Sequence, residues 1–525
     1  MKSSAKKIQI YDTTLRDGSQ GEDISFSVQD KLLIARRLDE AGFDYIEGGW
    51  PGANPKDVQF FKDVKKIKFQ HAKLVAFGST MRAGGKASED PILKGLLAAE
   101  TQVITIFGKS WDLHVREVFK VPLEENLRMI FESVKYLKSK GKEVVYDAEH
   151  FFDGYRANPE YALKAIMAAR DAGASVLVLC ETNGGNMPSV VAKIVAEVKA
   201  KLKHPLGIHP HNDTAMGVAN AIAAVEAGAI HVQGTVNGIG ERCGNCDLIP
   251  VIANLELKFG FNCLSPGKLR ELTAVSRFVS EVCNMVPAKS QPYVGQSAFA
   301  HKGGVHIDAV KKNPITYEHV DPASVGNARK HLVSEMGGRT NIILKAQEWG
   351  IDLKKEAPET KAILRSVQVL ENEGYQFEGA DASVELLMRK IIGRQKKFFK
   401  ASAEIKNERI GEKNPDVMAI VKVSVKGAKS KTIRKTGDGP VDALAKALKM
   451  ALTDSYPEIA EVELDDYKVR IVNSKAGTAA KVRVIIEFHD KERVWSTIGV
   501  STNIIEASWK ALIDAMEYKL LRSAL

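Results

Sequence analysis

Cysteine is scarce in this sequence, and its scarcity excludes a fold held together by disulfides. Only five cysteines occur in 525 residues, whereas disulfide-stabilised scaffolds are small and dense in cysteine. Cys243 and Cys246 form a lone CxxC, and no second pair follows at the spacing of a zinc site. We interpret these two cysteines as packing residues beside a functional loop.

The sequence also lacks the features of membrane and nucleic-acid-binding proteins. It has no run of about 18 apolar residues, which a transmembrane helix would need, and its first residues form no apolar signal segment. The net charge is +10, yet aromatic side chains are not interleaved with the basic ones. We therefore expect a cytoplasmic protein that binds neither membrane nor nucleic acid. The positive charge is compatible with an anionic small molecule such as a coenzyme A thioester.

Short apolar runs recur along the first half of the chain, and amphipathic stretches with helical spacing lie between them. A length of 525 residues predicts two to four domains. Eight strands about 25–40 residues apart, each followed by a helix, favour an α/β fold of the (β/α)8 TIM-barrel type over an open sheet. We predict this barrel over residues 1–270. Its strands are expected at residues 7–12, 43–47, 73–77, 103–107, 144–148, 176–180, 206–209 and 230–235.

The strand–helix rhythm stops near residue 270, which predicts further domains. Residues 271–400 are expected to form a mainly helical linker region, and the basic, polar stretch 394–415 is interpreted as a boundary or hinge. Residues 401–525 are predicted to form an α+β domain without clustered metal-ligand residues, so a regulatory or dimerisation role is favoured. Its strands are expected at residues 417–427, 467–473, 480–490 and 493–501, and its helices at 440–452 and 503–521.

Two histidines at the end of the seventh predicted strand suggest a metal site. His209 and His211 are two residues apart, so in a strand their side chains point to the same face. Pro210 between them suggests that the strand ends here, because proline cannot donate to the ladder. Two neutral imidazoles at this spacing suit a divalent metal when oxygen ligands join them. The alternative is a pair of polar loop residues, and the HxH pattern alone does not decide between the two.

Polar residues at the ends of other predicted strands favour the metal site. In a TIM barrel the active site lies at the C-terminal ends of the strands. Acidic, amide, hydroxyl and guanidinium groups occur at that pole after several strands, and this distribution is atypical of ordinary solvated loops. These candidate residues are Arg16, Asp17, Glu47, Glu149, Thr182 and Asn245.

Several longer motifs resemble one enzyme family over nearly the whole chain. The motifs are DTTLRDGSQ at 12–20, IEGGWPG at 46–52, HPHND at 209–213, NGIGERCGN at 237–245, TGDGPVDAL at 436–444 and GVSTNIIEASWKALIDAMEYKL at 499–520. They are similar to those of the 2-isopropylmalate, homocitrate and citramalate synthase family, whose metal-dependent barrels condense acetyl-CoA with a 2-oxo acid. The stretch IEGGWPGANPKD most resembles the citramalate branch, which uses pyruvate.

The resemblance implies roles for individual residues. Asp17, His209 and His211 match the metal ligands of the family, and Asn245 matches a further ligand. Arg16 matches the arginine that faces the substrate carbonyl oxygen. The remaining matches are a catalytic acid, a residue that holds the substrate carboxylate, a histidine in acid–base work and a tyrosine from the region that follows it, namely Glu149, Thr182, His306 and Tyr317. The family's Asp-Thr-Val-Gly after strand six is here Glu181–Gly184, with Thr182 retained.

The resemblance further implies a divalent cofactor, which could be magnesium, manganese or zinc, and acetyl-CoA as cosubstrate. It also implies a homodimer and a branched-chain amino acid effector, with isoleucine favoured. We expect a small pocket for pyruvate in which Phe107 excludes branched 2-oxo acids, although Phe107 could equally be an ordinary core residue. The alternatives are a 2-isopropylmalate synthase that uses 2-oxoisovalerate, an acyl-CoA lyase on the same barrel, and an amino-acid-binding sensor.

Overall fold

The structure is a computed structural model that describes residues 6–51, 53–331, 333, 338–407, 417–472 and 480–525. The chain divides into two compact units. The first contains residues up to Phe299 together with Val320–Ala328, and the second contains Ala300–His319 together with Arg329–Leu525. Among the described residues, no helix combines the length and apolar character needed to cross a bilayer.

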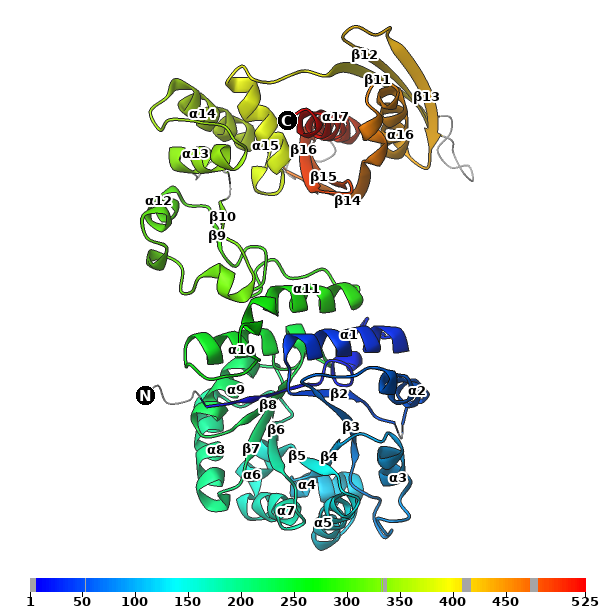
Figure 1. Ribbon diagram of the computed structural model, residues 1–525, viewed down its shortest axis with the longest axis vertical. Helices are drawn as coiled ribbons and strands as arrows, with labels where there is room; N and C mark the ends of the chain where they lie inside the picture. The colour runs from blue at the N-terminus through cyan, green and yellow to red at the C-terminus, as the bar shows by residue number, and fades with distance from the viewer. Residues whose placement is uncertain (1–5, 52, 332, 334–337, 408–416, 473–479) are drawn as a thin grey trace. The chain divides into compact units, whose positions relative to one another are not determined.

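The first unit contains the predicted barrel (Figure 1). Eight parallel strands close on themselves in chain order, because the first strand pairs with both the second and the eighth. The TIM-barrel prediction is thereby confirmed, with each strand within a few residues of its expected place. The strands are β1 (Gln9–Asp12), β2 (Tyr45–Gly49), β3 (Lys73–Ser79), β4 (Val103–Lys109), β5 (Glu143–Glu149), β6 (Val176–Glu181), β7 (Leu206–Pro210) and β8 (His231–Gly234).

Helices surround this barrel, and local signals determine where they begin and end. At the first of them, Ser27 and Asp30 form a capping box, and Gly42 ends the helix in the left-handed conformation, with φ +87°. The helices are α1 (Val28–Ala41), α2 (Pro55–Asp63), α3 (Pro91–Ala98), α4 (Asp112–His114), α5 (Leu123–Ser139), α6 (Phe151–Ala157), α7 (Pro159–Asp171), α8 (Pro188–Leu202), α9 (Gly217–Glu226), α10 (Leu248–Leu257) and α11 (Leu272–Val282).

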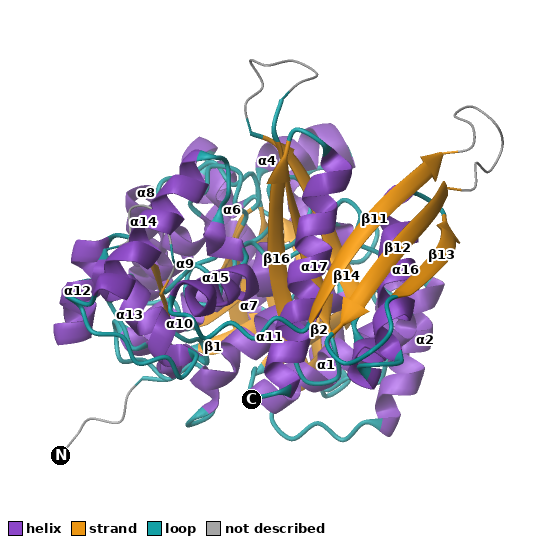
Figure 2. Cartoon of the chain, turned by 90° about the horizontal axis from the view of Figure 1, so that it is seen from above, coloured by secondary structure: helices purple, strands orange, loops and turns teal. Residues whose placement is uncertain are grey.

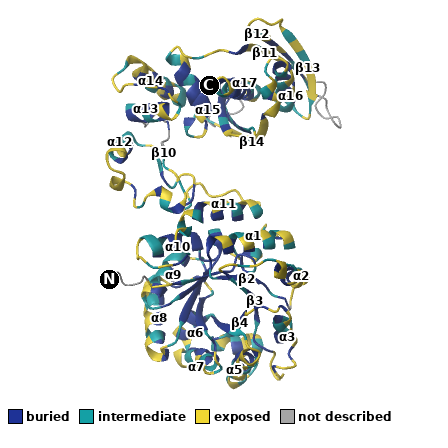
Figure 3. Ribbon diagram, in the orientation of Figure 1, coloured by how far each residue is buried: buried dark blue, intermediate teal, exposed yellow. Residues whose placement is uncertain are grey.

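Two apolar layers hold the barrel together, and Figure 3 shows that its strands are mostly buried. The larger layer lies between strands and helices and contains side chains such as Ile10, Leu38 and Ile104. A smaller cluster, which includes Tyr11 and Val145, comes from strand residues of the opposite parity. This separation follows from the alternation of side chains along each strand. The barrel is therefore a filled core, and its functional cavity must lie at one end of the strands.

The second unit begins with a mainly helical region. Two short parallel strands, β9 (Ala300–His301) and β10 (Lys330–His331), pair with each other. Helices α12 (Gly304–Lys312), α13 (Arg339–Glu348), α14 (Pro358–Asn372) and α15 (Asp381–Ile391) make up most of the rest. The predicted order of a helical linker before an α+β domain is confirmed, whereas its exact boundaries stay a prediction.

The C-terminal part repeats one arrangement of three strands and a helix (Figure 2). One antiparallel sheet has the order β11–β12–β13 and is followed by α16, and the other has the order β14–β15–β16 and is followed by α17. The strands are β11 (Phe399–Asn407), β12 (Val417–Val425), β13 (Lys431–Gly437), β14 (Glu463–Ile471), β15 (Val482–His489) and β16 (Val494–Ser501), and the helices are α16 (Pro440–Thr453) and α17 (Ile504–Ser523).

Two strands of this domain contradict the sequence-based expectation. The hinge predicted over 394–415 is wrong for Phe399–Asn407, which form β11 and pair with β12 along their whole length; residues 408–416 lie outside the described residues. The strand β13 (Lys431–Gly437) was not expected, because its sequence KTIRKTG is polar and mostly exposed. Both are edge strands, and pairing with β12 forms them despite weak intrinsic β propensity.

A buried carboxylate on α17 gives this domain a pH-dependent stability. Glu517 is 4% exposed and accepts the backbone N–H of Phe398 at 3.4 Å, and burial raises its pKa to about 7. Because the folded pKa exceeds the unfolded one, stability falls as pH rises from about 4.5 to about 7. We expect Glu517→Gln to raise the free energy of unfolding at pH 8 by on the order of 3 kcal/mol and to give little gain at pH 4, below both pKa values. Urea denaturation at the two pH values measures this difference. The exposed Glu492→Gln serves as the control, and an equal effect of Glu517→Gln at both pH values would contradict the assignment.

Candidate active site

A cavity of about 260 Å³ opens at the C-terminal ends of the barrel strands. Its walls combine the predicted polar residues with an aromatic surface. The lining residues are Arg16, Asp17, Gln20, Trp50, Phe77, Phe107, Asp147, Glu149, Cys180, Thr182, His209, His211, Glu241 and Arg242. Residues from both ends of the barrel sequence therefore meet at one site, as the strand-end prediction requires.

Three of the predicted metal ligands gather on one side of this cavity. One potential ligand atom from each of Asp17, His209 and His211 lies within 4.8 Å of the others. Oδ2 of Asp17 lies 3.2 Å from Nε2 of His209, and the two imidazole rings are 5.4 Å apart. Pro210 ends β7, as expected, and a backbone bridge pairs His211 with Asn245 from the loop after β8. All four side chains are buried.

Two buried polar atoms without a hydrogen-bond partner among the described residues show that these residues fit a bound cation. Within the described chain, Nδ1 of His211 and Oδ1 of Asn245 are buried without a hydrogen-bond partner. The amide nitrogen of Asn245 donates to the carbonyl of Ile239 at 3.3 Å, which leaves Oδ1 unused. Buried polar atoms are nearly always paired, so these two orphans beside a carboxylate and a second imidazole fit a bound cation. Nitrogen and oxygen donors suit magnesium, manganese or zinc.

The electrostatics of the cluster favour the ligand forms of Asp17 and His211, whereas the pKa of His209 is raised because its contact with Asp17 outweighs burial. Burial opposes the ionisation of Asp17, but Arg16 and His209 together hold the pKa of this carboxyl well below its usual range. Burial, with His209 nearby, lowers the pKa of His211 to about 4. At neutral pH Asp17 is therefore an anion and His211 a neutral imidazole, as metal binding requires.

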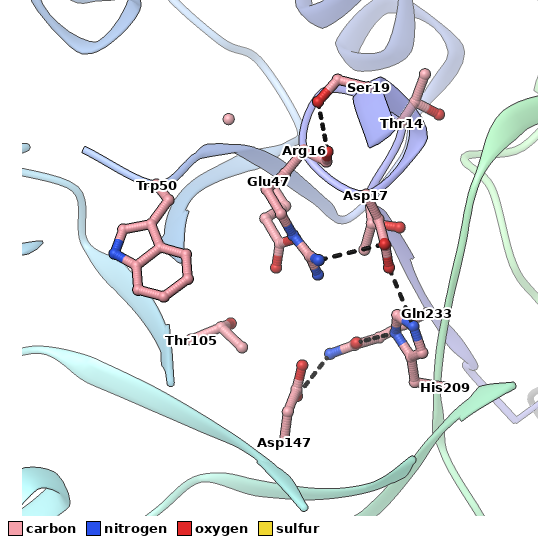
Figure 4. A network of polar contacts seen from close by, with 12 residues as sticks. Thr14, Arg16, Asp17, Ser19, Glu47, Trp50, Thr105, Asp147, His209 and Gln233 are labelled. Carbon is pink, nitrogen blue, oxygen red and sulfur yellow. Dashed lines mark hydrogen bonds and ion pairs between the residues drawn. The ribbon is translucent and has the colours of Figure 1, made fainter. Parts of the chain in front are cut away.

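Arg16 is held in place by the carboxylates of Glu47 and Asp17 (Figure 4) and by the ring of Phe77. Its Nε donates to Oε1 of Glu47 at 2.6 Å, and its Nη1 lies 3.3 Å from Oδ1 of Asp17. Its guanidinium carbon lies 3.8 Å from the centre of the Phe77 ring. Glu47 is fully buried and also bonds to the hydroxyl of Tyr11, so it lies behind Arg16 rather than among the residues that line the cavity.

Glu149 ends β5, and Thr182 directly follows the neighbouring strand β6. Glu149 forms an ion pair with Lys109, the last residue of β4. Thr182 accepts a hydrogen bond at Oγ1 from the backbone N–H of His150 at 2.9 Å. Its carbonyl accepts from Arg242 at 2.8 Å. The two side chains predicted for acid catalysis and carboxylate binding thus both line the cavity that holds the metal cluster.

Three aromatic rings form the apolar wall of the cavity. Phe77 and Phe107 stack with their centroids 5.5 Å apart. Trp50 meets both of them edge-on, at 5.9 Å and 5.8 Å. The structure therefore places Phe107 in the cavity wall, within a group of rings that support one another.

The remaining predicted residues lie in the second unit. His306 is on α12 and Tyr317 follows it, and their rings stack at 4.2 Å with both side chains exposed. Their roles at the barrel cavity stay a prediction. For the CxxC, Cys246 is buried as expected, but Cys243 is exposed, so the packing interpretation is wrong for that residue.

Sequence reasoning missed several residues of the cavity. Asp147 precedes Glu149 by two positions, so strand alternation alone would have brought it to the same face. Trp50 lies within the recognised motif at 46–52, but its contacts with Phe77 join distant parts of the sequence. Burial, with Glu47 nearby, raises the pKa of Asp147 to about 7, even though His209 acts in the opposite direction.

Comparisons with known proteins agree with this geometry. Residues 7–279 match the HMGL-like family, residues 293–374 match the homocitrate synthase post-HMGL domain-like family, and residues 378–520 match the LeuA allosteric (dimerisation) domain. The dimerisation domain supports a homodimer, and the first match supports a metal-dependent enzyme that uses acetyl-CoA.

Comparison with individual proteins shows which branch of the HMGL-like family this chain is most similar to. The chain is 52% identical to an (R)-citramalate synthase of Geobacter sulfurreducens, with 98% of each chain covered. It is also 52% identical to an (R)-citramalate synthase of Aquifex aeolicus, with 99% of this chain and 98% of the relative covered. A probable 2-isopropylmalate synthase of Methanopyrus kandleri is 32% identical, with 97% of each chain covered. The chain therefore belongs to the citramalate synthase family, within the HMGL-like enzymes.

Proposed function

We propose that this protein condenses acetyl-CoA with pyruvate and releases citramalate and CoA. The single observation that carries the proposal is the cluster of Arg16 with Asp17, His209 and His211 beside an aromatic wall in one cavity. A charged, metal-binding side suits the carboxylate and ketone oxygens of a small 2-oxo acid. An apolar wall on the other side suits its methyl group. The reaction leads towards isoleucine, and a 2-isopropylmalate synthase is the alternative.

The residues divide the chemistry between them. A divalent metal held by Asp17, His209, His211 and Asn245 would supply Lewis-acid polarisation of the 2-oxo acid. Arg16 stabilises the negative charge that develops on the ketone oxygen, because its guanidinium stays charged and is already oriented by its two carboxylate neighbours.

The other groups act on the substrate carboxylate and on protons. Thr182 donates a hydrogen bond from its hydroxyl to the substrate carboxylate. Glu149 acts as a general acid or base for the reacting groups. Glu47 acts through Arg16, whose Nε it holds. His306 and Tyr317 of the second unit take part in acid–base steps. Carbon–carbon bond formation follows loss of a methyl proton from acetyl-CoA, and hydrolysis of the thioester then makes the reaction irreversible.

Further parts of the proposal concern the allosteric effector, the oligomeric state and the location in the cell. The C-terminal domain binds a branched-chain amino acid effector, isoleucine in the first instance, and the working unit is a homodimer in the cytoplasm. The support is the match of residues 378–520 to an allosteric dimerisation domain. If added isoleucine and leucine both leave the kinetics unchanged, this part of the proposal is wrong.

Release of CoA tests the proposed reaction directly. The full-length protein is incubated with acetyl-CoA, Mn²⁺ and either pyruvate or 2-oxoisovalerate, and free thiol is measured over time. We expect strong preference for pyruvate. Preference for 2-oxoisovalerate would identify a 2-isopropylmalate synthase, and no thiol release with either acid would exclude both synthases. A parallel assay of acyl-CoA cleavage without any 2-oxo acid tests the lyase alternative.

The aromatic wall predicts how substrate choice can be changed. Phe107→Ala removes the ring that stacks on Phe77 and enlarges the space beside the metal cluster. We expect kcat/KM for 2-oxoisovalerate relative to pyruvate to rise at least about tenfold, since one or two methylenes in an apolar pocket change binding by about 1–3 kcal/mol. The matched control is Phe119→Ala, which removes a ring that does not line this cavity. An unchanged substrate ratio in Phe107→Ala would contradict a role for this wall in specificity.

A further inference from the structure

The metal cluster is continued behind His209 by a chain of two buried hydrogen bonds (Figure 4). Nδ1 of His209 lies 2.7 Å from Oε1 of Gln233 on β8. The amide nitrogen of Gln233 lies 3.0 Å from Oδ1 of Asp147 on β5 and donates to it. All three side chains are at most 5% exposed. A path of hydrogen bonds therefore runs from the cavity floor at Asp147 to the imidazole that faces Asp17.

The chemistry of the amide group gives this path a direction. An amide has a donor end and an acceptor end, and the nitrogen of Gln233 is the end that donates to Asp147. With its nitrogen turned towards Asp147, Gln233 must present its oxygen to His209. That oxygen can only accept, so Nδ1 of His209 must carry the proton. The opposite orientation would require a proton on Asp147 between the two oxygens.

The proton position at Nδ1 determines what His209 can do on its other side. A neutral imidazole with its proton on Nδ1 has its lone pair on Nε2. Nε2 is the atom that lies 3.2 Å from Asp17, inside the proposed metal cluster.

We propose that Gln233, oriented by Asp147, is the positioning residue that fixes the tautomer and ring orientation of His209 and thereby prepares the site for the metal ion. This inference rests on the metal site of the proposed function. Groups that orient metal-binding histidines typically change metal affinity by 10–100-fold when they are removed.

Mn²⁺ binding to the full-length protein tests this role without reference to catalysis. Metal-free protein is titrated with Mn²⁺, and the free ion is measured by electron paramagnetic resonance. We expect Gln233→Leu to weaken Mn²⁺ binding about 10–100-fold. Gln233→Glu should bind within about threefold of the wild type, because a shared proton lets the new side chain accept from His209 and donate to Asp147. Thermal unfolding should rank the variants differently, since Leu suits a buried position better than Glu.

A matched control exists elsewhere in the same barrel. Gln9 on β1 makes an equivalent contact, with its Oε1 3.1 Å from Nδ1 of His231. Gln9→Leu should leave Mn²⁺ affinity unchanged. Asp147→Leu provides a second route, because it frees Gln233 to reverse its amide, and it should weaken binding at least about threefold. Wild-type Mn²⁺ affinity in folded Gln233→Leu or Asp147→Leu would overturn the inference. If the wild type itself binds no Mn²⁺, or if Asp17→Asn binds it equally well, the metal site of the proposed function fails instead.

Discussion

Replacing Arg16 with alanine is expected to lower kcat about a hundred- to a thousandfold. The guanidinium lies in the cavity wall with its Nε on Glu47 and its Nη1 beside Asp17, and Phe77 packs on its face. This arrangement holds a permanent positive charge where the ketone oxygen becomes negative. Loss of one donor to a developing oxyanion typically costs about 3–4 kcal/mol, which corresponds to this fall in kcat.

Measuring both kcat and Mn²⁺ affinity distinguishes a catalytic role of Arg16 from a purely structural one. In Arg16→Ala, Mn²⁺ should still bind, because Asp17, His209 and His211 are unchanged. Arg16→Lys should recover part of the lost turnover, since it keeps the charge but not the planar fork that Glu47 holds. The exposed Arg36→Ala on α1 is the matched surface control. Near-normal turnover in Arg16→Ala would remove this residue from the mechanism.

Local patterns in the sequence were sufficient to predict the barrel and most of the polar residues at the C-terminal ends of its strands. Most barrel strands contain a short, largely apolar run, and such runs indicate buried parallel strands without any knowledge of contacts. The positions of His209 and His211 followed from two-residue alternation and from Pro210 as the last residue of β7. Once these strands close into a barrel, their C-terminal ends meet at one place. The cluster with Asp17 was predictable for this reason.

What the sequence could not predict depends on contacts between distant residues. Gln233 is an ordinary polar residue of β8 until the fold brings it between His209 and Asp147. The strand β11 has little intrinsic tendency to be extended and forms through its ladder with β12. Glu47 was a candidate because it ends the strand predicted over residues 43–47, but its carboxylate is bound by Arg16 and Tyr11. In each case the partner, rather than the residue type, determines the role.

Replacing His211 with alanine is expected to abolish tight metal binding and to lower turnover about a thousandfold or more, because Lewis-acid assistance contributes several kcal/mol. The folded state should tolerate the change, since Nδ1 of His211 has no hydrogen bond to lose within the described chain.

Thermal unfolding with and without Mn²⁺ separates the loss of metal binding from any loss of fold stability. Mn²⁺ should raise the melting temperature of the wild type, because an ion that binds only the native state stabilises it. The melting temperature of His211→Ala should not respond to Mn²⁺, whereas the exposed control His71→Ala should respond as the wild type does. A chelator should inactivate the wild type, and added Mn²⁺ should restore it. Full activity of His211→Ala in the presence of the chelator would show that the cluster at the end of β7 is not a metal site.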